Sequence, residues 1–191
     1  GDKILLAVDA NCAYERSSAI AIGQRLVEND LLWFEEPISS DDVEGYSEIR
    51  RALKVRISGA EQLRGHRAFR RMVQERALDI IQPDVCICGG FTEYRKIAAM
   101  ASANHVRVIP HMFGTAIRLN ATLHMLAALP NWPRSHEPFP TLLEFDMSEN
   151  ALRTELAKEP VRHNAGMVAI PQAPGLGIEI NREVLARYTQ S

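Results

Sequence analysis

The sequence predicts a parallel α/β fold, specifically a large part of an eight-stranded (β/α) barrel. Short apolar runs alternate with longer segments whose apolar residues recur at helical spacing, which is the pattern of consecutive strand–helix units. The chain of 191 residues is 46% apolar, which is enough for one sizeable core. In addition, an acidic or imidazole side chain follows each of five successive apolar runs at intervals of 23 to 27 residues: Asp9, Glu35, Glu61, Asp84 and His111.

The strands and helices follow from this alternation. The predicted strands are short apolar runs, and in chain order they lie at residues 4–8, 31–34, 55–58, 79–81, 106–109 and 141–145. The predicted helices follow them at residues 15–28, 41–53, 66–75, 92–104, 116–128 and 149–157. The helical stripe is clear in the first of these, where Ala19, Ile22 and Leu26 share one face.

Glycine, proline and capping residues set several of the boundaries. Residues 39–41 offer N-caps for the second helix, and Gly89 and Gly90 precede the fourth. Pro130 ends the fifth helix, and the prolines within 131–140 predict a loop. The C-terminal tail does not continue the strand–helix alternation. We expect two extended segments, at 167–170 and 175–180, and a final helix at 182–188.

The strand-end residues distinguish a barrel from a doubly wound sheet. The carboxyl ends of consecutive barrel strands surround one opening, whereas those of a doubly wound sheet lie on both sides of a switch point. A set of chemically related side chains after consecutive strands therefore favours the barrel. A complete barrel needs about 200–250 residues, and six strands are predicted here, so about two would be missing. The chain begins with Gly1, and we expect a processed, trimmed or partial product.

Charge and cysteine content narrow the class of protein. The net charge is −2 with no basic block, which argues against nucleic acid as a partner. No apolar run reaches the roughly 18–20 residues that span a membrane, and no signal-peptide pattern is present, so we expect a cytoplasmic protein without a membrane partner. The three cysteines fit a reducing compartment. Cys86 and Cys88 lack a second cysteine pair, so we interpret them as thiols near a strand end and not as zinc ligands.

Three of the strand-end residues predict a metal site. Asp9, Glu35 and Glu61 would repel one another on adjacent strand ends if no cation lay between them. A set of carboxylate oxygens suits Mg²⁺, or alternatively Mn²⁺. Glu36 competes with Glu35 for this role, and only one of the two faces the opening because side chains alternate along a strand.

The next strand ends predict an acid–base pair. Asp84 and His111 on consecutive strands can form a hydrogen bond that fixes the imidazole tautomer and favours its protonated form. His111 is then a general acid and base beside a substrate. Glu144, at the end of the sixth strand, would donate a hydrogen bond from the opposite side. Glu137, in the preceding loop, is the alternative for that role. Together these groups predict removal of a proton next to a carboxylate.

Several motifs resemble one family. Val-Asp-Ala-Asn, Trp-Phe-Glu-Glu-Pro, Gly-Ala-Glu-Gln, Gln-Pro-Asp-Val and Pro-His-Met-Phe-Gly-Thr resemble the mandelate racemase/muconate lactonizing enzyme family of the enolase superfamily. Cys-Gly-Gly-Phe-Thr-Glu, Leu-Glu-Phe-Asp and the tail are most similar to its D-galactarolactone cycloisomerase and acid-sugar dehydratase members. The resemblance implies Mg²⁺ on Asp9, Glu35 and Glu61, the Asp84–His111 dyad as the base, and Glu144 as the opposing acid.

The resemblance also implies a fold and a domain organisation. Residues 1–160 would be strands three to eight of a modified (β/α) TIM barrel, and residues 161–191 a C-terminal tail that packs on a capping domain absent from this chain. The first two strands, with the Lys-x-Lys motif of relatives, would be absent too. Such enzymes are often homo-oligomers when complete, and we expect the same here.

Three functional hypotheses follow. The first is an Mg²⁺-dependent isomerase or lyase that abstracts the α-proton of a small carboxylate, namely a hydroxy acid, an acid sugar or its lactone. The resulting enediolate leads to dehydration, cycloisomerisation or racemisation. The second is a non-catalytic truncated fragment, inactive without its N-terminal part. The third, a metal-dependent aldolase barrel, is disfavoured because no Gly-rich phosphate loop follows a late strand.

Overall fold

The computed structural model describes residues 4–129 and 139–189. Its main feature is a five-stranded, wholly parallel sheet in the order β1-β2-β3-β4-β5. The strands are β1 (Leu6–Asp9), β2 (Leu31–Glu35), β3 (Ile57–Gly59), β4 (Ile80–Ile81) and β5 (Arg107–Val108). Each strand lies beside the next one in the chain, as in a barrel wall and unlike a doubly wound sheet. The predicted choice between the two architectures is therefore confirmed.

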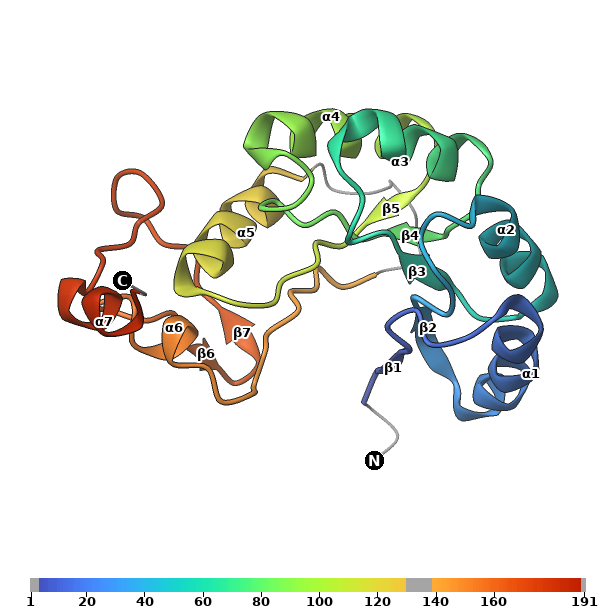
Figure 1. Ribbon diagram of the computed structural model, residues 1–191, viewed down its shortest axis with the longest axis horizontal. Helices are drawn as coiled ribbons and strands as arrows, with labels where there is room; N and C mark the ends of the chain where they lie inside the picture. Colours follow the sequence, from blue (N-terminus) through green and yellow to red (C-terminus); the bar gives the residue numbers. More distant parts are fainter. Residues whose placement is uncertain (1–3, 130–138, 190–191) are drawn as a thin grey trace.

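Helices connect the strands and cover the outer side of the sheet (Figure 1). Those between the strands are α1 (Arg16–Leu26), α2 (Val43–Ala52), α3 (Gly65–Gln74) and α4 (Gly90–Ala103), with a 3₁₀ turn η1 (Val27–Asn29) after α1. After β5 the chain continues with α5 (Ala116–Ala128), α6 (Ala151–Thr154) and α7 (Arg182–Tyr188), of which α6 and α7 lie away from the sheet (Figure 1). Most boundaries lie within two residues of the predicted ones. The N-cap of α2 is Asp42, whose carboxylate accepts from the backbone N–H of Gly45 at 3.0 Å, so the capping residue lies one position beyond the predicted range.

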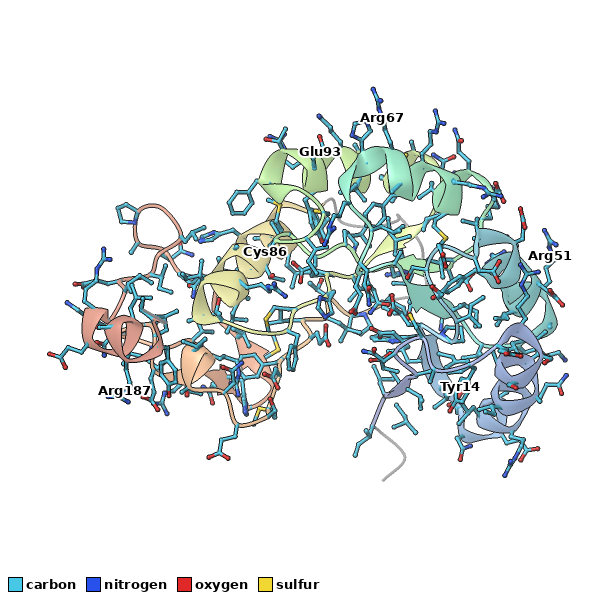
Figure 2. All side chains as sticks on the ribbon, viewed as in Figure 1. Tyr14, Arg51, Arg67, Cys86, Glu93 and Arg187 are labelled. Carbon is cyan, nitrogen blue, oxygen red and sulfur yellow. The ribbon has the colours of Figure 1, made fainter. Side chains whose placement is uncertain are left out.

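The main core lies between the strands and these helices. Phe34, Ile57 and Ile81 are fully buried and project from the sheet toward fully buried apolar residues of the helices, such as Phe69 and Ile97. Polar side chains such as Arg51 and Arg67 lie on the outer surface (Figure 2). Since side chains alternate along a strand, the neighbours Glu35 and Ser58 face the opposite side of the sheet.

Strand register places the candidate site residues at one edge. Asp9 and Glu35 are direct register partners on β1 and β2, and Glu35 is in turn the partner of Ser58 on β3. The loops that follow β3, β4 and β5 carry the remaining candidates a few residues past the strand ends. Because the strands are parallel, all these positions lie at the same end of the sheet.

The prediction of a sixth strand at 141–145 is wrong. The segment is irregular, and within the described ranges the sheet ends at β5. It does lie beside the chain that follows β5, but side chains hold it there. Leu143 and Phe145 pack on a small core with Met112, and the backbone N–H of Met112 donates to a Glu144 carboxylate oxygen at 2.8 Å. The two-residue β5 offers few groups for a ladder, and the proline at 140 has no N–H to donate.

The C-terminal residues form a separate group of small elements beside α5 (Figure 1). The expected extended segment at 167–170 is the second strand of a hairpin, β6 (His163–Asn164) with β7 (Met167–Val168). The segment at 175–180 forms one antiparallel bridge, between Ile180 and Ala157. A third apolar cluster joins Ala157 to Ala116 of α5. The described part of the chain contains no helix that is both long enough and apolar enough to cross a membrane.

Glu93 joins α4 to the start of α3 on the outer surface (Figure 2). One carboxylate oxygen accepts from the backbone N–H of His66 at 2.9 Å and contacts its Nδ1 at 2.6 Å, while the other accepts from Lys96 at 2.6 Å. The backbone N–H of His66, then Lys96 and the His66 ring, lower the pKa of Glu93 to about 2. The charged carboxylate therefore stabilises the junction of the two helices.

We expect Glu93→Gln to lower the melting temperature at pH 7. A carboxyl group whose pKa is depressed on folding stabilises above its unfolded pKa, near 4.5, and loses that effect as the pH falls toward about 2. The difference between the two proteins should therefore shrink over that acidic range in thermal unfolding followed by circular dichroism. Glu149→Gln, at an exposed position, is the control. A difference that is independent of pH would show that the Glu93 charge is not the cause.

Candidate active site

Three carboxylates lie at the ends of the first three strands. Asp9 ends β1, and its Oδ1 accepts from the backbone N–H of Asn11 at 2.8 Å, which closes a tight turn after the strand. Glu35 ends β2 and is buried, with one carboxylate oxygen accepting from the indole N–H of Trp33 at 2.8 Å. Glu61 lies just beyond β3, partly buried. These are the residues that the sequence predicted to share one edge.

Mutual repulsion and burial perturb this group. Burial raises the pKa of Glu35 to about 7, although hydrogen bonds from Gln82 and Trp33 oppose the rise. Burial likewise raises the pKa of Glu61 to about 7, in spite of the nearby His111. The charge of Asp9 adds to the rise at both positions. The folded chain therefore holds carboxylates that would be relieved by a positive charge between them.

The carboxylate oxygens of Asp9, Glu35 and Glu61 suit a hard cation, but the side chains are too far apart in this structure to hold one together. Within residues 4–129 and 139–189, no three Asp, Glu, His or Cys side chains meet closely enough to hold a metal ion. Glu61 Oε2 instead lies 3.3 Å from His111 Nε2, and the hydrogen bond from Trp33 holds Glu35. Oxygen-only ligands are those that Mg²⁺ prefers.

Glu36, the residue after Glu35, has a different environment from that of Glu35. Glu36 is 1% exposed, and its oxygens accept hydrogen bonds from neighbouring loops. Its backbone has a φ of 36°, which turns its side chain away from the Glu35 direction. The two adjacent glutamates therefore face different surroundings, as side-chain alternation predicts.

Asp84 and His111 are in contact, as expected from their consecutive strand ends. His111 Nδ1 lies 2.7 Å from Oδ2 of Asp84, which is completely buried. Burial lowers the pKa of His111, but the hydrogen bond to Asp84 and the charges of Glu144 and Glu61 outweigh it, so the pKa lies above its ordinary value. With Nδ1 held by Asp84, Nε2 is the ring nitrogen that faces Glu61.

Arg118 is part of this arrangement, although it is not among the site residues predicted from the sequence. Its Nη1 lies 3.2 Å from Asp84 Oδ2, the same oxygen that contacts His111, and donates to the carbonyl of Phe113 at 2.8 Å. Arg118 lies in the first turn of α5, where Thr115 caps the helix by accepting from its backbone N–H at 3.3 Å. The position of Arg118 seven residues after His111 would have been a usable signal, because the loop between them is short.

Glu144 also contributes a carboxylate to this site. Its carboxylate accepts from the backbone N–H of Met112, the residue after His111, at 2.8 Å. Glu144 is exposed to solvent as a residue, but desolvation by the neighbouring protein still raises the pKa of its carboxyl group. The alternative candidate, Glu137, lies outside the described residues.

A polar cavity of about 620 Å³ connects these groups. Asp9, Glu61, His111, Glu144 and Arg118 all line it. Glu35 and Asp84 are more deeply buried. The cavity is large enough for a small organic acid, and it presents carboxylates on several sides with the imidazole of His111 among them. Such a set can bind a cation, orient a small anion beside it and move a proton.

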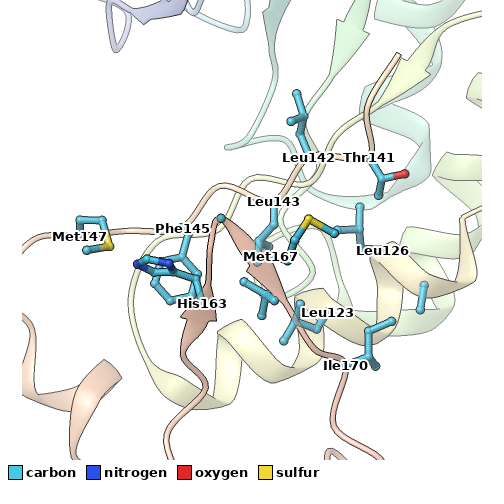
Figure 3. Close-up of a pocket in the computed structure, with 13 residues that line it drawn as sticks. Leu123, Leu126, Thr141, Leu142, Leu143, Phe145, Met147, His163, Met167 and Ile170 are labelled. Atoms are coloured by element: carbon cyan, nitrogen blue, oxygen red, sulfur yellow. The ribbon is translucent and has the colours of Figure 1, made fainter. Parts of the chain in front are cut away.

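A second cavity, of about 440 Å³, has a different character. It lies between α5, residues 141–147 and the β6–β7 hairpin, with Leu123, Phe145, Met167 and Ile170 among its lining residues (Figure 3). His163 is the one titratable residue among those that line it within the described chain. Among the described residues, the cavity therefore offers one titratable group in a mainly apolar lining.

Comparison with known proteins identifies close relatives of this arrangement. The profile of the family described as "Enolase C-terminal domain-like" matches residues 1–184. The chain is 37% identical to D-galactarolactone cycloisomerase from Agrobacterium fabrum over 188 residues, which is 98% of this chain and 50% of that protein. The crystal structure of 3,6-anhydro-D-galactonate cycloisomerase from Zobellia galactanivorans superposes with a TM-score of 0.91 at 34% identity, covering 100% of this chain and 52% of that one.

A further similar structure is that of a relative with bound ligands. It is L-talarate dehydratase from Polaromonas sp. JS666, complexed with Mg and L-glucarate, with a TM-score of 0.82 at 27% identity over 97% of this chain and 47% of that one. The chain spans about half the length of the curated relatives it matches.

The shared oxygen of Asp84 predicts opposite shifts in two variants. Asp84→Asn removes a negative charge and should lower the pKa of His111, since the hydrogen bond to Asp84 is the largest influence that raises it. Arg118→Gln removes the positive charge 3.2 Å from the same oxygen and should raise the pKa of His111. NMR titration of the His111 ring in the metal-free protein measures both. Shifts in the same direction would contradict the shared-oxygen arrangement.

Proposed function

The chain belongs to the enolase C-terminal domain-like family, in the mandelate racemase/muconate lactonizing enzyme group of the enolase superfamily, and from this membership we propose its function. Its sheet and helices are the C-terminal part of that superfamily's barrel. The proposed reaction is Mg²⁺-dependent abstraction of the α-proton of a small carboxylate, such as an acid sugar or its lactone. The observation that carries the proposal is the convergence of Asp9, Glu61, His111 and Glu144 on one cavity.

Asp9, Glu35 and Glu61 are the residues that we propose hold Mg²⁺. Their carboxylate oxygens are of the ligand type that this ion prefers, and burial, with a contribution from the charge of Asp9, raises the pKa values of Glu35 and Glu61 to about 7. When bound, Mg²⁺ would supply the positive charge that stabilises an enediolate. A related dehydratase structure is described as complexed with Mg, which supports the same ion here.

His111 is the proposed base. Asp84 holds Nδ1, so the proton would be taken up and returned at Nε2, the nitrogen on the side of the cavity. A base must be neutral to accept a proton, and the pKa of His111 lies above its ordinary value. Proton abstraction should therefore become faster as the pH rises through the pKa of this imidazole.

Glu144 is the proposed acid on the opposite side. Crowding by protein raises its pKa, which favours the neutral carboxylic acid that can donate a hydrogen bond to a developing negative charge. The backbone N–H of Met112 fixes the other end of this carboxyl group. Dehydration, cycloisomerisation and racemisation share the same first step, and relatives include both cycloisomerases and dehydratases.

The alternative is a fragment that is inactive on its own. It is favoured by the coverage of about half of each relative. An assay of this chain beside the complete natural protein separates the two. Activity in the complete protein alone supports the site assignment and the fragment, whereas activity in both supports a self-sufficient catalytic half.

Removing the imidazole should abolish exchange of the substrate α-proton. We expect His111→Asn to lower the rate by about 100-fold or more, the typical contribution of a general base, while Mg²⁺ affinity stays close to that of the wild type. The measurement is proton NMR in D₂O with Mg²⁺ and a panel of sugar acids, their lactones and 2-hydroxy acids. His124→Asn, whose Nε2 contacts the carbonyl of Leu176, is the matched control. Undiminished exchange in the His111 variant would remove it from the mechanism.

Removing a proposed ligand charge should act on the metal instead. We expect Glu61→Gln to weaken Mg²⁺ binding by about 100-fold, at the upper end of the range seen for changes around metal sites. Isothermal titration calorimetry with Mg²⁺ measures this directly, and Glu159→Gln at an exposed position is the control. Equal affinity in the Glu61 variant and the wild type would exclude Glu61 as a ligand.

A further inference from the structure

We propose that Glu36 is a positioning residue whose buried carboxylate connects the three loops that follow β1, β2 and β3, which adjoin Asp9 and Glu35 and carry Glu61. It would act on the metal site without touching the ion, by fixing the relative places of these three carboxylates. The inference rests on the proposed function, because it assumes that Asp9, Glu35 and Glu61 bind Mg²⁺. It adds a role for a residue that the reaction itself does not use.

Glu36 is among the most deeply buried charged residues of the chain, at 1% exposure. Burying a carboxylate is unfavourable unless its oxygens receive hydrogen bonds. Oε2 of Glu36 accepts from the thiol of Cys12 at 3.2 Å. Oε1 accepts from the hydroxyl of Ser40 at 3.0 Å and from the backbone N–H of Ala60 at 3.2 Å. Both oxygens are therefore occupied by neutral donors of the protein.

The three donors come from three different connections of the barrel wall. Cys12 lies in the loop between β1 and α1, Ser40 between β2 and α2, and Ala60 between β3 and α3. Each loop also carries or adjoins one proposed metal ligand. Cys12 is three residues after Asp9, and Ala60 is the residue immediately before Glu61. A movement of the Glu36 carboxylate would therefore displace or break hydrogen bonds from all three loops.

The backbone at these contacts is held in an unusual conformation. Cys12, Glu36 and Ala60 have φ values of 61°, 36° and 78°, in the left-handed region that non-glycine residues seldom adopt. Such conformations persist only where the surroundings fix them, and they concentrate at functional sites. Here the three residues in this conformation are the carboxylate itself and two of its donors. The Glu36 hydrogen bonds are thus suited to hold three strained loop positions at once.

The neighbouring glycine makes room for this carboxylate. A Cβ atom at Gly59 would lie 3.1 Å from Glu36 Cγ and 3.1 Å from the hydroxyl oxygen of Tyr46. Gly59 ends β3, so the strand itself approaches the Glu36 side chain closely. Main-chain bonds reinforce the arrangement, since the N–H of Cys12 donates to the Glu36 carbonyl at 2.7 Å and the N–H of Glu36 donates to the Ser58 carbonyl at 3.0 Å.

The test measures Mg²⁺ affinity separately from stability. In the complete natural protein, Glu36→Gln replaces one accepting oxygen by an NH₂ group, and we expect the Mg²⁺ dissociation constant to rise by about 10-fold or more, as for outer-sphere changes at metal sites. Cys12→Ala should also raise the Mg²⁺ dissociation constant, but by less. Cys12→Ser keeps a hydrogen-bond donor at this position and should restore wild-type affinity. Calorimetry gives the affinity, and melting temperature in EDTA gives the stability.

Ser47→Ala is the matched control, because Ser47 is also a buried serine, on α2, and its hydroxyl has no hydrogen-bond partner among the residues that the structure describes. It should leave Mg²⁺ affinity unchanged, whereas Ser40→Ala should weaken it. If Glu36→Gln does not fold, the Ser40 and Cys12 variants decide by the same criterion. Lower melting temperatures with unchanged Mg²⁺ affinity would overturn the inference and leave Glu36 as a purely structural residue. Absence of Mg²⁺ binding in the wild type would overturn the proposed function, and this inference with it.

Discussion

Negative charge gathered at the carboxyl end of a parallel sheet is the constraint on which the candidate site depends. Asp9 and Glu35 are register partners, and Glu61 and Glu144 complete the group around one cavity. Burial and mutual repulsion raise the pKa values of Glu35 and Glu61 to about 7. The fold therefore maintains an arrangement that a divalent cation would stabilise, at some expense to the stability of the metal-free chain.

Each of these carboxylates has different neighbouring groups, and we therefore propose different roles within the group. Trp33 and Gln82 engage Glu35, His111 faces Glu61, and the Met112 N–H holds Glu144. The Asp84–His111 pair has its own support in Arg118, which shares Asp84 Oδ2 with the imidazole. A cluster of like charges can thus supply proposed ligands, a base and an acid because each member has different hydrogen-bond partners.

The Glu36 contacts connect this chemistry to the architecture. Consecutive strands of a barrel wall are adjacent in space, so the three loops after β1, β2 and β3 can be joined by one side chain. The left-handed backbone at Cys12 and Ala60 lies where the loops meet that carboxylate. Adjacent glutamates in one motif would then have separate roles, with Glu35 proposed for the metal and Glu36 for the loops.

The sequence by itself determined the strand–helix alternation, the choice of barrel, and the residues that meet at the sheet edge, because these depend on periodicity and on residue type after each strand. It also indicated that the two adjacent glutamates have different surroundings, because side chains alternate along a strand. Only the tertiary structure decided that residues 141–145 are irregular, that Arg118 reaches Asp84, and that Glu36 bridges three loops. Those features depend on contacts between residues far apart in the chain or on the geometry of short loops, and neither leaves a periodic pattern in the sequence.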